Sequence, residues 1–176
     1  TQEQKGDPLY TIEPRYWIPV NAARKSLSTR IGEEKYYLAA RRVTNVISNA
    51  RTTMACVAPN YPANDMVISF GFENTRAHTY AESCLLAVSI FNSFPFDYLA
   101  RLRVSENLLK GVLFELPVPT PKDIIRYRLL DPKNISLASY IVPRVLELTY
   151  TAYDLRPFAQ ECGYDGPPFR WDEARR

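Results

Sequence analysis

The amino-acid sequence predicts an α+β fold, and three observations support this class. Short stretches rich in aromatic and β-branched residues, which are typical of strands, occur mainly in the first half of the chain. Stretches with helical spacing of apolar residues dominate after residue 121. The two kinds of stretch do not alternate regularly, as a doubly wound parallel sheet would require. We therefore expect a curved, mostly antiparallel or mixed sheet with packed helices, followed by a mainly helical C-terminal appendage.

The 176 residues are enough for one well-cored domain with an appendage. We divide the chain into a linker at residues 1–13, a main domain at residues 14–121 and a helical extension at residues 122–176. The linker is expected to lead into a short strand at Leu9–Ile12, and the main domain to end in the proline-rich arm Pro117–Pro121. Because the chain lacks an initiator Met, we expect a piece of a longer protein, truncated in its extension.

Four strands are expected in the main domain, because β-branched or aromatic residues there are bounded by turn residues. They cover Tyr36–Val43, Thr53–Val57, Met66–Phe72 and Leu109–Leu116. The polar stretch between the first two is suited to a turn, so these two strands are expected to form a strand–turn–strand unit.

Helices are expected where apolar residues recur at spacings of three and four. The clearest is His78–Phe91, in which Ala81, Leu85 and Val88 follow this spacing without an internal proline. This helix is expected to pack on the sheet. The other expected helices are Val20–Ser28, Phe96–Val104, Ile124–Leu130 and Ser136–Ala159, the last broken at Pro143 and again at Pro157.

The charge distribution fits a polyanionic partner. The formal net charge is only +3, but residues 15–51 hold eight basic and two acidic side chains, and residues 101–128 hold six basic and three acidic ones. Basic segments bind nucleic acids because each neutralised phosphate releases counterions. A solvated surface that is basic by chance would show the same pattern.

The sequence gives no sign of a membrane or secreted protein. No apolar run reaches the ~18 residues that a membrane span needs, and the polar N-terminus lacks the features of a signal peptide. The three cysteines, Cys56, Cys84 and Cys162, are far apart and odd in number, which favours reduced thiols. We therefore expect a cytoplasmic protein that does not bind a membrane.

No complete catalytic or metal site is expected in this chain. Three scattered cysteines and one histidine, His78, are too few for the roughly four ligands of a zinc site. Asp165–Phe169 approaches the catalytic motif of adenine-N6 methyltransferases, but Gly166 stands where the polar residue that orients the target amine must be. Glu33–Lys35 matches only the second half of a metal-dependent nuclease motif. No nucleophile turn accompanies His78, which argues against a hydrolase.

Five short segments occur in an order that is found in a known family. They are Arg15–Pro19; Arg42–Thr44 with Asn49–Thr53; Asn92–Arg101; Leu116–Pro119; and Ala159 with Cys162–Tyr164 and Pro167–Arg176. In this order they resemble the C-terminal target-recognition domain of type IIG restriction–modification enzymes, which are adenine-N6 DNA methyltransferases. The second and third segments match its patterns "Arg, then Asn-x-Arg-Thr" and "Asn-Ser-x-x-x-Asp-x-x-x-Arg". One departure follows Val104, where Ser105–Asn107 replaces a turn that usually contains glycine.

The resemblance implies that residues 14–121 are a DNA target-recognition domain that reads base sequence in double-stranded DNA. It also implies a parent chain with a methyltransferase domain, with or without an attached nuclease, as the second partner. S-adenosylmethionine, and Mg²⁺ where a nuclease is present, would then belong to the parent. This piece itself is expected to hold no cofactor and no catalytic residue.

Nine residues are candidate DNA contacts: Arg15, Lys25, Arg42, Asn49, Arg51, Thr52, Arg101, Arg103 and Lys110. Arg51 on a polar turn could reach guanine O6 and N7 or a phosphate, and Asn49 could pair with an adenine edge. Arg42 and Arg101 are also candidates for a structural role, in which Arg42 pairs with a carboxylate such as Asp97. Lysines of this set are expected to meet phosphates.

A second function remains open from the sequence alone. The chain could be a protein-interaction or scaffolding domain without DNA binding, in which the Pro117–Pro121 arm docks a partner. This alternative predicts binding without a steep dependence on salt concentration, whereas DNA binding predicts a steep one.

Overall fold

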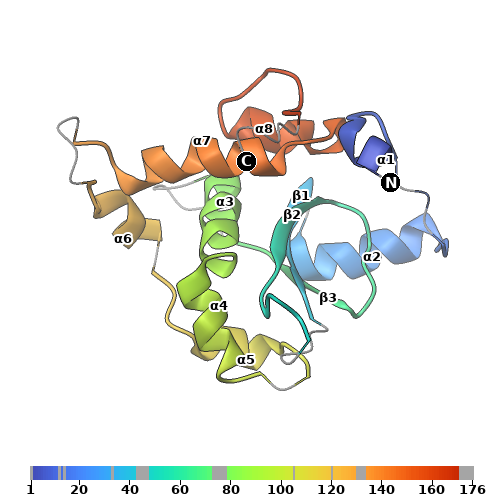
Figure 1. Ribbon diagram of the computed structural model, residues 1–176. Coiled ribbons are helices and arrows are strands. Elements are labelled where there is room, and N and C mark those ends of the chain that lie inside the picture. The colour runs from blue at the N-terminus through green and yellow to red at the C-terminus, as the bar shows by residue number, and fades with distance from the viewer. Residues whose placement is uncertain are drawn as a thin grey trace.

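An antiparallel sheet and the helices around it give the protein the α+β fold that the sequence predicts (Figure 1). The computed structural model describes residues 2–11, 13, 15–32, 34–42, 48–72, 79–104, 106–119, 121–129 and 134–170. The strands are β1 (Tyr36–Arg41), β2 (Ala55–Pro59) and β3 (Val67–Phe70). The helices are α1 (Gln2–Gly6), α2 (Val20–Ile31), α3 (Tyr80–Phe91), α4 (Phe94–Arg101), α5 (Lys110–Glu115), α6 (Pro121–Arg126), α7 (Leu137–Thr149), the 3₁₀ turn η1 (Tyr153–Leu155) and α8 (Arg156–Glu161).

The strands are arranged in the order β2–β1–β3, and both pairings are antiparallel. Leu38 in the central strand lies opposite Val57 of β2 and Phe70 of β3. The first three expected strands are therefore confirmed: β1 and β3 are shorter than expected, and β2 lies two residues later in the chain. Successive side chains of a strand point to opposite faces of its sheet. The run Tyr36–Ala40 is buried throughout, so both faces of the central strand are covered.

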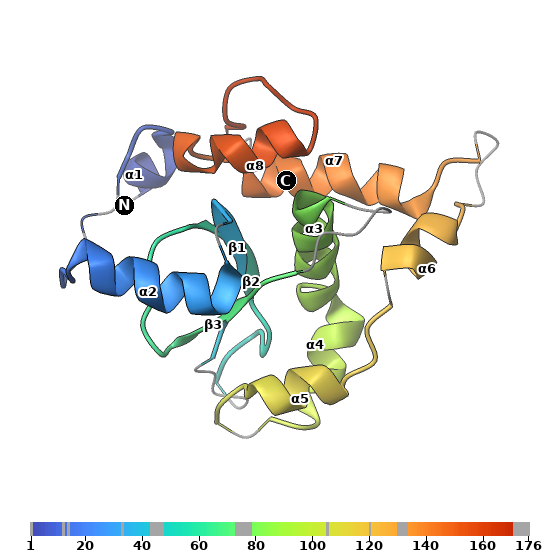
Figure 2. The same ribbon diagram turned by 180° about the vertical axis from the view of Figure 1, so that it is seen from behind.

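The sheet lies between the α3–α4 pair on one side and α2 on the other (Figures 1 and 2). Tyr36, Leu38 and Ala40 belong to the main core together with α3. Tyr37 and Ala39 pack into a small second cluster. The alternation of the two faces along β1 thus separates one large core from one small one.

Helix α3 confirms the expected helix that packs on the sheet. A capping box starts it: the Thr79 side chain accepts from Glu82 N, and the Glu82 carboxylate accepts from Thr79 N. Such reciprocal bonds satisfy two backbone donors that a helix start otherwise leaves unpaired. Most of the helix is buried because β1 and β2 cover one side and α7 covers another. His78, the expected first residue, lies outside the described residues.

Helix α4 follows directly and begins two residues earlier than expected, at Phe94. Its cap is Ser93, whose side chain accepts from Phe96 N, and Pro95 lies in the first turn, where a missing N–H has no helical partner to lose. Among the described residues no single helix is long and apolar enough to cross a membrane, and α3 and α4, which together reach that length, are bent by 64°.

Two expected strands are wrong. Leu109–Leu116 contains helix α5, in which Leu113 is buried and Phe114 is exposed. A short apolar run fits either a strand or a helix by its periodicity, so the sequence pattern could not separate the two. Leu9–Thr11 forms no strand and follows helix α1 in what was expected to be a linker, while Ile12 lies outside the described residues.

The chain after residue 121 is mainly helical, as expected, but its predicted breaks are wrong. Helix α7 continues through the exposed Pro143, and Pro157 lies in the first turn of α8. Packing explains the first result: Val142, Val145 and Leu146 of α7 join the core beside α3, which holds the segment helical despite one missing hydrogen bond. In place of the end of the expected Ile124–Leu130 helix, Arg128 forms an isolated antiparallel bridge with Ser136.

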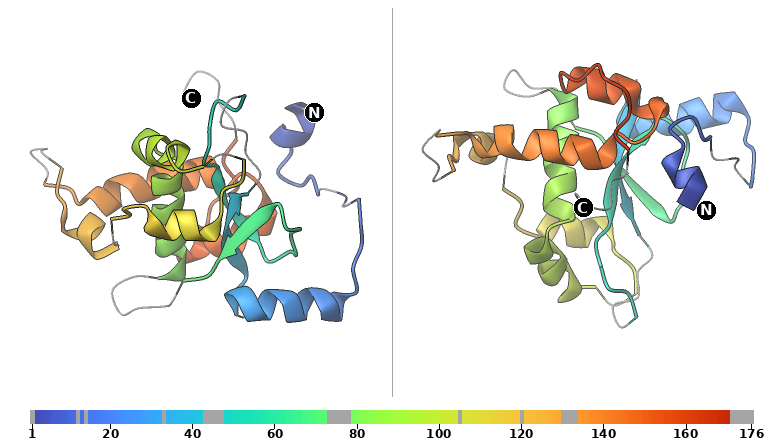
Figure 3. Two further views of the ribbon diagram at one scale, coloured as in Figure 1. Left: turned by 90° about the horizontal axis from the view of Figure 1, so that it is seen from below. Right: turned by 45° about the horizontal axis from the view of Figure 1, so that its top comes forward.

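The C-terminal helices α7 and α8 lie beside the sheet (Figure 3). Their buried side chains belong to the same core as those of the strands. The rings of Tyr36 in β1 and Phe158 in α8 have centroids 5.1 Å apart, and the Tyr36 hydroxyl donates to the Glu161 carboxylate. Tyr150, which ends α7, is fully buried in the same cluster. Side chains on both sides of residue 121 therefore stabilise one another.

Candidate nucleic-acid interface

A buried carboxylate, Asp97, lies in the first turn of α4 and is 6% exposed. Its Oδ1 accepts hydrogen bonds from Thr52 N at 2.8 Å and from Thr53 N at 2.7 Å. The Thr53 hydroxyl lies 3.0 Å from the same oxygen. Hydrogen bonds to a charged acceptor are about twice as strong as neutral ones, so this residue holds the chain just before β2 firmly against α4.

Two arginines surround this carboxylate. Arg51 Nε lies 3.4 Å from Asp97 Oδ1, and Arg101 Nη2 lies 4.0 Å from Asp97 Oδ2. Arg101 also donates to the carbonyl oxygens of Asn49 and Ala50, at 3.0 Å each. Arg101 therefore links its own helix α4 to the turn before β2 through the backbone of that turn.

Arg51 faces the junction between α3 and α4. Its Nη2 donates to the Asn92 carbonyl at 2.6 Å, and its guanidinium lies over the Phe94 ring, 4.8 Å from the centroid. A planar guanidinium that combines hydrogen bonds with stacking on an aromatic ring is held in one orientation. These contacts direct the Arg51 guanidinium into the protein rather than toward solvent.

The junction binds the start of β2 as well. The Asn92 side chain accepts from Ala55 N at 2.9 Å and donates to Ala55 O at 2.8 Å. The Thr53 hydroxyl lies 2.7 Å from the Phe91 carbonyl, to which it can donate. We call the set Asn49, Ala50, Arg51, Thr52, Thr53, Asn92, Asp97 and Arg101 the Asp97 network.

Opposing effects act on the pKa of Asp97. Burial removes water from the carboxylate and raises its pKa, but the hydrogen bonds from Thr53 and Thr52 and the charge of Arg51 outweigh burial. The net result is a pKa below the usual range of an aspartate. The carboxylate is therefore ionised at neutral pH, which matches its two cationic neighbours.

The network joins two of the segments that the sequence analysis singled out, Asn49–Thr53 and Asn92–Arg101. The expected pairing of Arg42 with Asp97 is wrong, because Arg51 and Arg101 occupy that carboxylate. Arg42 Nη1 instead lies 3.4 Å from the Asp65 carbonyl, and its own carbonyl accepts from Leu108 N at 2.8 Å.

Further basic side chains lie at the same end of the molecule, where β1 ends. The Arg42–Leu108 bond brings the segment before α5 beside this end of β1. We define the basic end as Arg41, Arg42, Arg103 and Lys110, of which Arg42 is half-buried and the others are exposed. Arg103 Nη1 forms an exposed ion pair with Glu115 Oε2 at 3.0 Å. Within the described part of the chain, no ion pair is formed by Arg41, Arg42 or Lys110.

Three of the nine candidates do not lie on this surface. Arg15 precedes α2 and lies over the Tyr16 ring, and Lys25 is exposed on α2, so the sheet separates both from α4 (Figure 2). Thr52 is 1% exposed and contributes its backbone N–H to Asp97. The structure therefore brings together Arg42, Asn49, Arg51, Arg101, Arg103 and Lys110.

Sequence reasoning gave no role to Asn92, which holds Ala55, or to Thr53, the strongest partner of Asp97. The only available signal was their place in the motif segments. Within the described parts of the chain, no three His, Cys, Asp or Glu side chains gather in a way that could hold a metal ion.

Comparisons of this chain with family models, with curated proteins and with solved structures found no match. The function must therefore be inferred from the geometry of the Asp97 network and of the basic end.

Proposed function

We propose that this chain is the DNA sequence-recognition module of a bacterial restriction–modification enzyme whose parent chain methylates adenine at N6. One observation supports the proposal most strongly: the two motif segments converge on Asp97. Thr52 and Asp97 are 45 positions apart, yet they share a buried hydrogen bond. A chance match of two short patterns gives no reason for their residues to meet in space.

In this proposal the candidate residues have different roles. Arg51, Arg101 and Asp97 act as an anchor that fixes the turn between β1 and β2. Contacts that fix register on DNA are mostly to phosphates, and exposed arginine and lysine side chains supply them. Arg41, Arg103 and Lys110 are exposed beside the anchored turn and take this role in the proposal.

Base reading then falls to the turn that the anchor presents, which includes Asn49. Its backbone carbonyl accepts from Arg101, so the place of Asn49 in the turn is set from α4. An asparagine placed in the major groove can pair with the N6 and N7 edge of adenine. This assignment replaces Arg51 as the expected reader, because the guanidinium of Arg51 is engaged inside the protein.

In this proposal the chain is a cytoplasmic DNA-binding module without its own catalytic residues. The methyltransferase domain of the parent, with any attached nuclease, is the second partner. It would bind S-adenosylmethionine and, where a nuclease is present, Mg²⁺. Double-stranded DNA would be clamped between the two parts.

The proposal is tested by the salt dependence of DNA binding, measured by fluorescence anisotropy with both this chain and the full parent. The logarithm of the affinity should fall linearly with the logarithm of salt concentration, and Lys110→Ala should reduce the slope by about 0.9, the value of one phosphate contact. Because a phosphate contact carries no sequence information, Lys110→Ala should weaken all DNA sequences equally.

Lys25→Ala is the matched control, since Lys25 is an exposed lysine on the far side of the sheet. It should leave the slope unchanged. A slope that does not depend on Lys110, or that changes equally in both variants, would contradict DNA binding through the basic end.

A second candidate function, docking onto another protein, is favoured by the outer face of α4. Phe94, Tyr98 and Leu102 follow one another at a spacing of four and are 79%, 62% and 65% exposed. Pro117–Pro119 of the proline arm are exposed as well. Binding that survives high salt and is lost in Tyr98→Ser would favour this alternative over DNA binding.

A further inference from the structure

The outer edge of the sheet carries backbone groups that point away from β1. Arg41 N donates to Met54 O and Asn60 N donates to Lys35 O, so these residues form the hydrogen-bonded pairs of the β1–β2 ladder. Residues of an antiparallel strand alternate between bonding to one neighbour and bonding to the other. It follows that the N–H and C=O groups of Ala55 and Val57 point outward.

The first of these outward pairs is already satisfied. The Asn92 amide accepts from Ala55 N at 2.9 Å and donates to Ala55 O at 2.8 Å. One side-chain amide thus takes the place that a residue of a neighbouring strand would occupy. The edge is therefore closed at the Ala55 end.

The second outward pair is not satisfied. Among the residues that the structure describes, none forms a hydrogen bond with the outward N–H or C=O of Val57. Val57 is only 4% exposed, and a buried polar group that is left unpaired destabilises the fold. Pro59, the next outward position, has no N–H, so an added strand can pair fully with Val57 alone.

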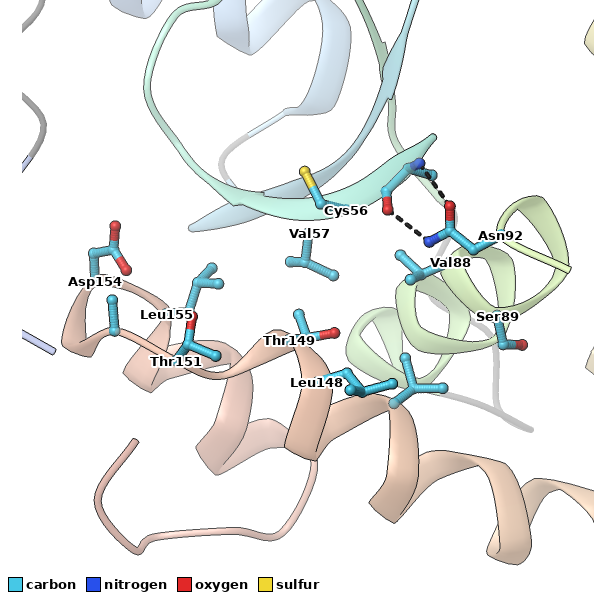
Figure 4. A pocket seen from close by; sticks show the side chains of 13 residues that line it. Cys56, Val57, Val88, Ser89, Asn92, Leu148, Thr149, Thr151, Asp154 and Leu155 are labelled. Atoms are coloured by element: carbon cyan, nitrogen blue, oxygen red, sulfur yellow. Dashed lines mark hydrogen bonds between the residues drawn. The ribbon is translucent and has the colours of Figure 1, made fainter. Parts of the chain in front are cut away.

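A groove of about 620 Å³ lies along this edge, between β2, α3, α7 and the segment that leads into α8 (Figure 4). Val88 of α3 and Leu148 of α7 contribute apolar side chains to its lining, and Leu148 is 59% exposed. Asn92 lies at one end of the groove and Asp154 at the other. Asp154 is exposed and has no ion-pair partner within the described part of the chain.

We propose that this groove binds a short extended peptide segment of another protein by adding it to the edge of β2. The peptide backbone pairs with the N–H and C=O of Val57, and an apolar side chain packs between Val88 and Leu148. A basic residue two positions away faces Asp154, since alternate side chains of a strand share one face. Backbone pairing supplies affinity in this mode of recognition, and the two side-chain positions supply specificity.

The observations favour a peptide over a nucleic acid at this place. A peptide offers one donor and one acceptor at the spacing that Val57 requires. A phosphate backbone would meet the negative charge of Asp154. This inference goes beyond the proposed DNA function and does not depend on it, because the groove and the basic end are different surfaces.

The test uses the full chain and a positional-scanning library of acetylated, amidated hexapeptides, with binding followed by fluorescence anisotropy. The library should select an apolar residue with Lys or Arg two positions away. Asp154→Lys should change the second preference from basic to acidic. Leu148→Ser should weaken binding of the selected peptide by about 10-fold or more, because the apolar side chain of the peptide then loses a leucine against which it is buried.

Both variants replace exposed side chains, and thermal unfolding monitors whether they fold. Glu106→Lys is the control for added charge away from the groove and should leave peptide affinity unchanged. Binding should also slow hydrogen exchange of the Val57 amide, and N-methylation of the paired peptide residue should abolish binding. Selection of no peptide, or affinity unchanged in both Asp154→Lys and Leu148→Ser, would overturn the proposal.

Discussion

At the scale of single residues, Asp97 shows how a buried charge can organise its surroundings. Its carboxylate is stabilised by two backbone N–H groups and by arginines from two different segments. Removing one partner from a buried charge leaves the others uncompensated, so such a site is sensitive to single substitutions. A surface ion pair has no such cost, because water replaces the lost partner.

Replacing Asp97 tests this reading. Asp97→Asn should lower the free energy of unfolding by about 2–4 kcal/mol, because the amide removes the charge and turns one acceptor into a donor that faces other donors. Urea denaturation measures the loss. Asp165→Asn is the control, since that carboxylate is exposed and pairs with Arg156 at 3.4 Å. It should change the free energy of unfolding far less than Asp97→Asn does, because water can replace an exposed partner.

The contribution of Asp97 to the free energy of unfolding should also decrease as pH falls. Because its pKa is lower in the folded protein than in the unfolded chain, ionised Asp97 stabilises the fold at neutral pH, and this contribution is lost as pH falls through the folded value. The difference in stability between the wild type and Asp97→Asn should shrink below about pH 4. A difference that stays constant down to about pH 2 would contradict the role of the charge.

At the scale of secondary-structure elements, the sequence predicted those helices and strands whose residue pattern agrees with their burial in the fold. Helix α3 was predictable because its apolar residues recur at helical spacing and are buried. The strands of the sheet were predictable because runs of aromatic and β-branched residues are bounded there by turn residues. Helix α5 was not predictable, because it is short and its apolar run fits the periodicity of a strand as well as that of a helix. The continuity of α7 was not predictable either, because it depends on contacts with α3, which is distant in sequence.

The same limits apply to the candidate site. The motif patterns indicated that Asn49–Thr53 and Asn92–Arg101 matter, and both segments are in the network. The patterns could not tell which arginine meets Asp97, since this depends on how the turn folds onto α4. They also could not show that Thr52 is buried or that α2 carries Lys25 away from the basic end.

Helix α7 offers a test of proline in a helix interior. Pro143 is exposed in the middle of the helix and lacks the N–H that would bond to the preceding turn. Pro143→Ala should therefore raise the free energy of unfolding by about 1–3 kcal/mol, as measured by urea denaturation. Pro157→Ala, in the first turn of α8, should bring no gain of this size, since proline is favoured there.

At the scale of the whole molecule, one core unites the sheet with the C-terminal helices. Phe158 is fully buried against Tyr36, and Tyr150 joins the same cluster. Chain segments that share a core unfold together, since neither keeps its buried surface without the other. The mainly helical appendage therefore acts as part of the support of β1.

A single core substitution should reveal this coupling. Phe158→Ala should cost about 3–5 kcal/mol, the range for deleting a buried phenylalanine ring. Native-state hydrogen exchange should then show equal losses of protection for amides of β1 and of α7. Unchanged protection in β1, with faster exchange confined to the C-terminal helices, would show instead that the two parts unfold independently.

The position of Asp97 along the chain also bears on the order of folding events. Its bonds to Thr52 and Thr53 join residues 45 and 44 positions apart, whereas the caps of α3 and α4 join residues three positions apart. Closing a long loop carries an entropic cost that local contacts avoid, and contacts of long range form more slowly. The helices can therefore form before the turn is fixed to them. Asp97→Asn should then accelerate unfolding more than it slows folding in stopped-flow measurements, and the anchored turn becomes the last part of the structure to form and the first to open.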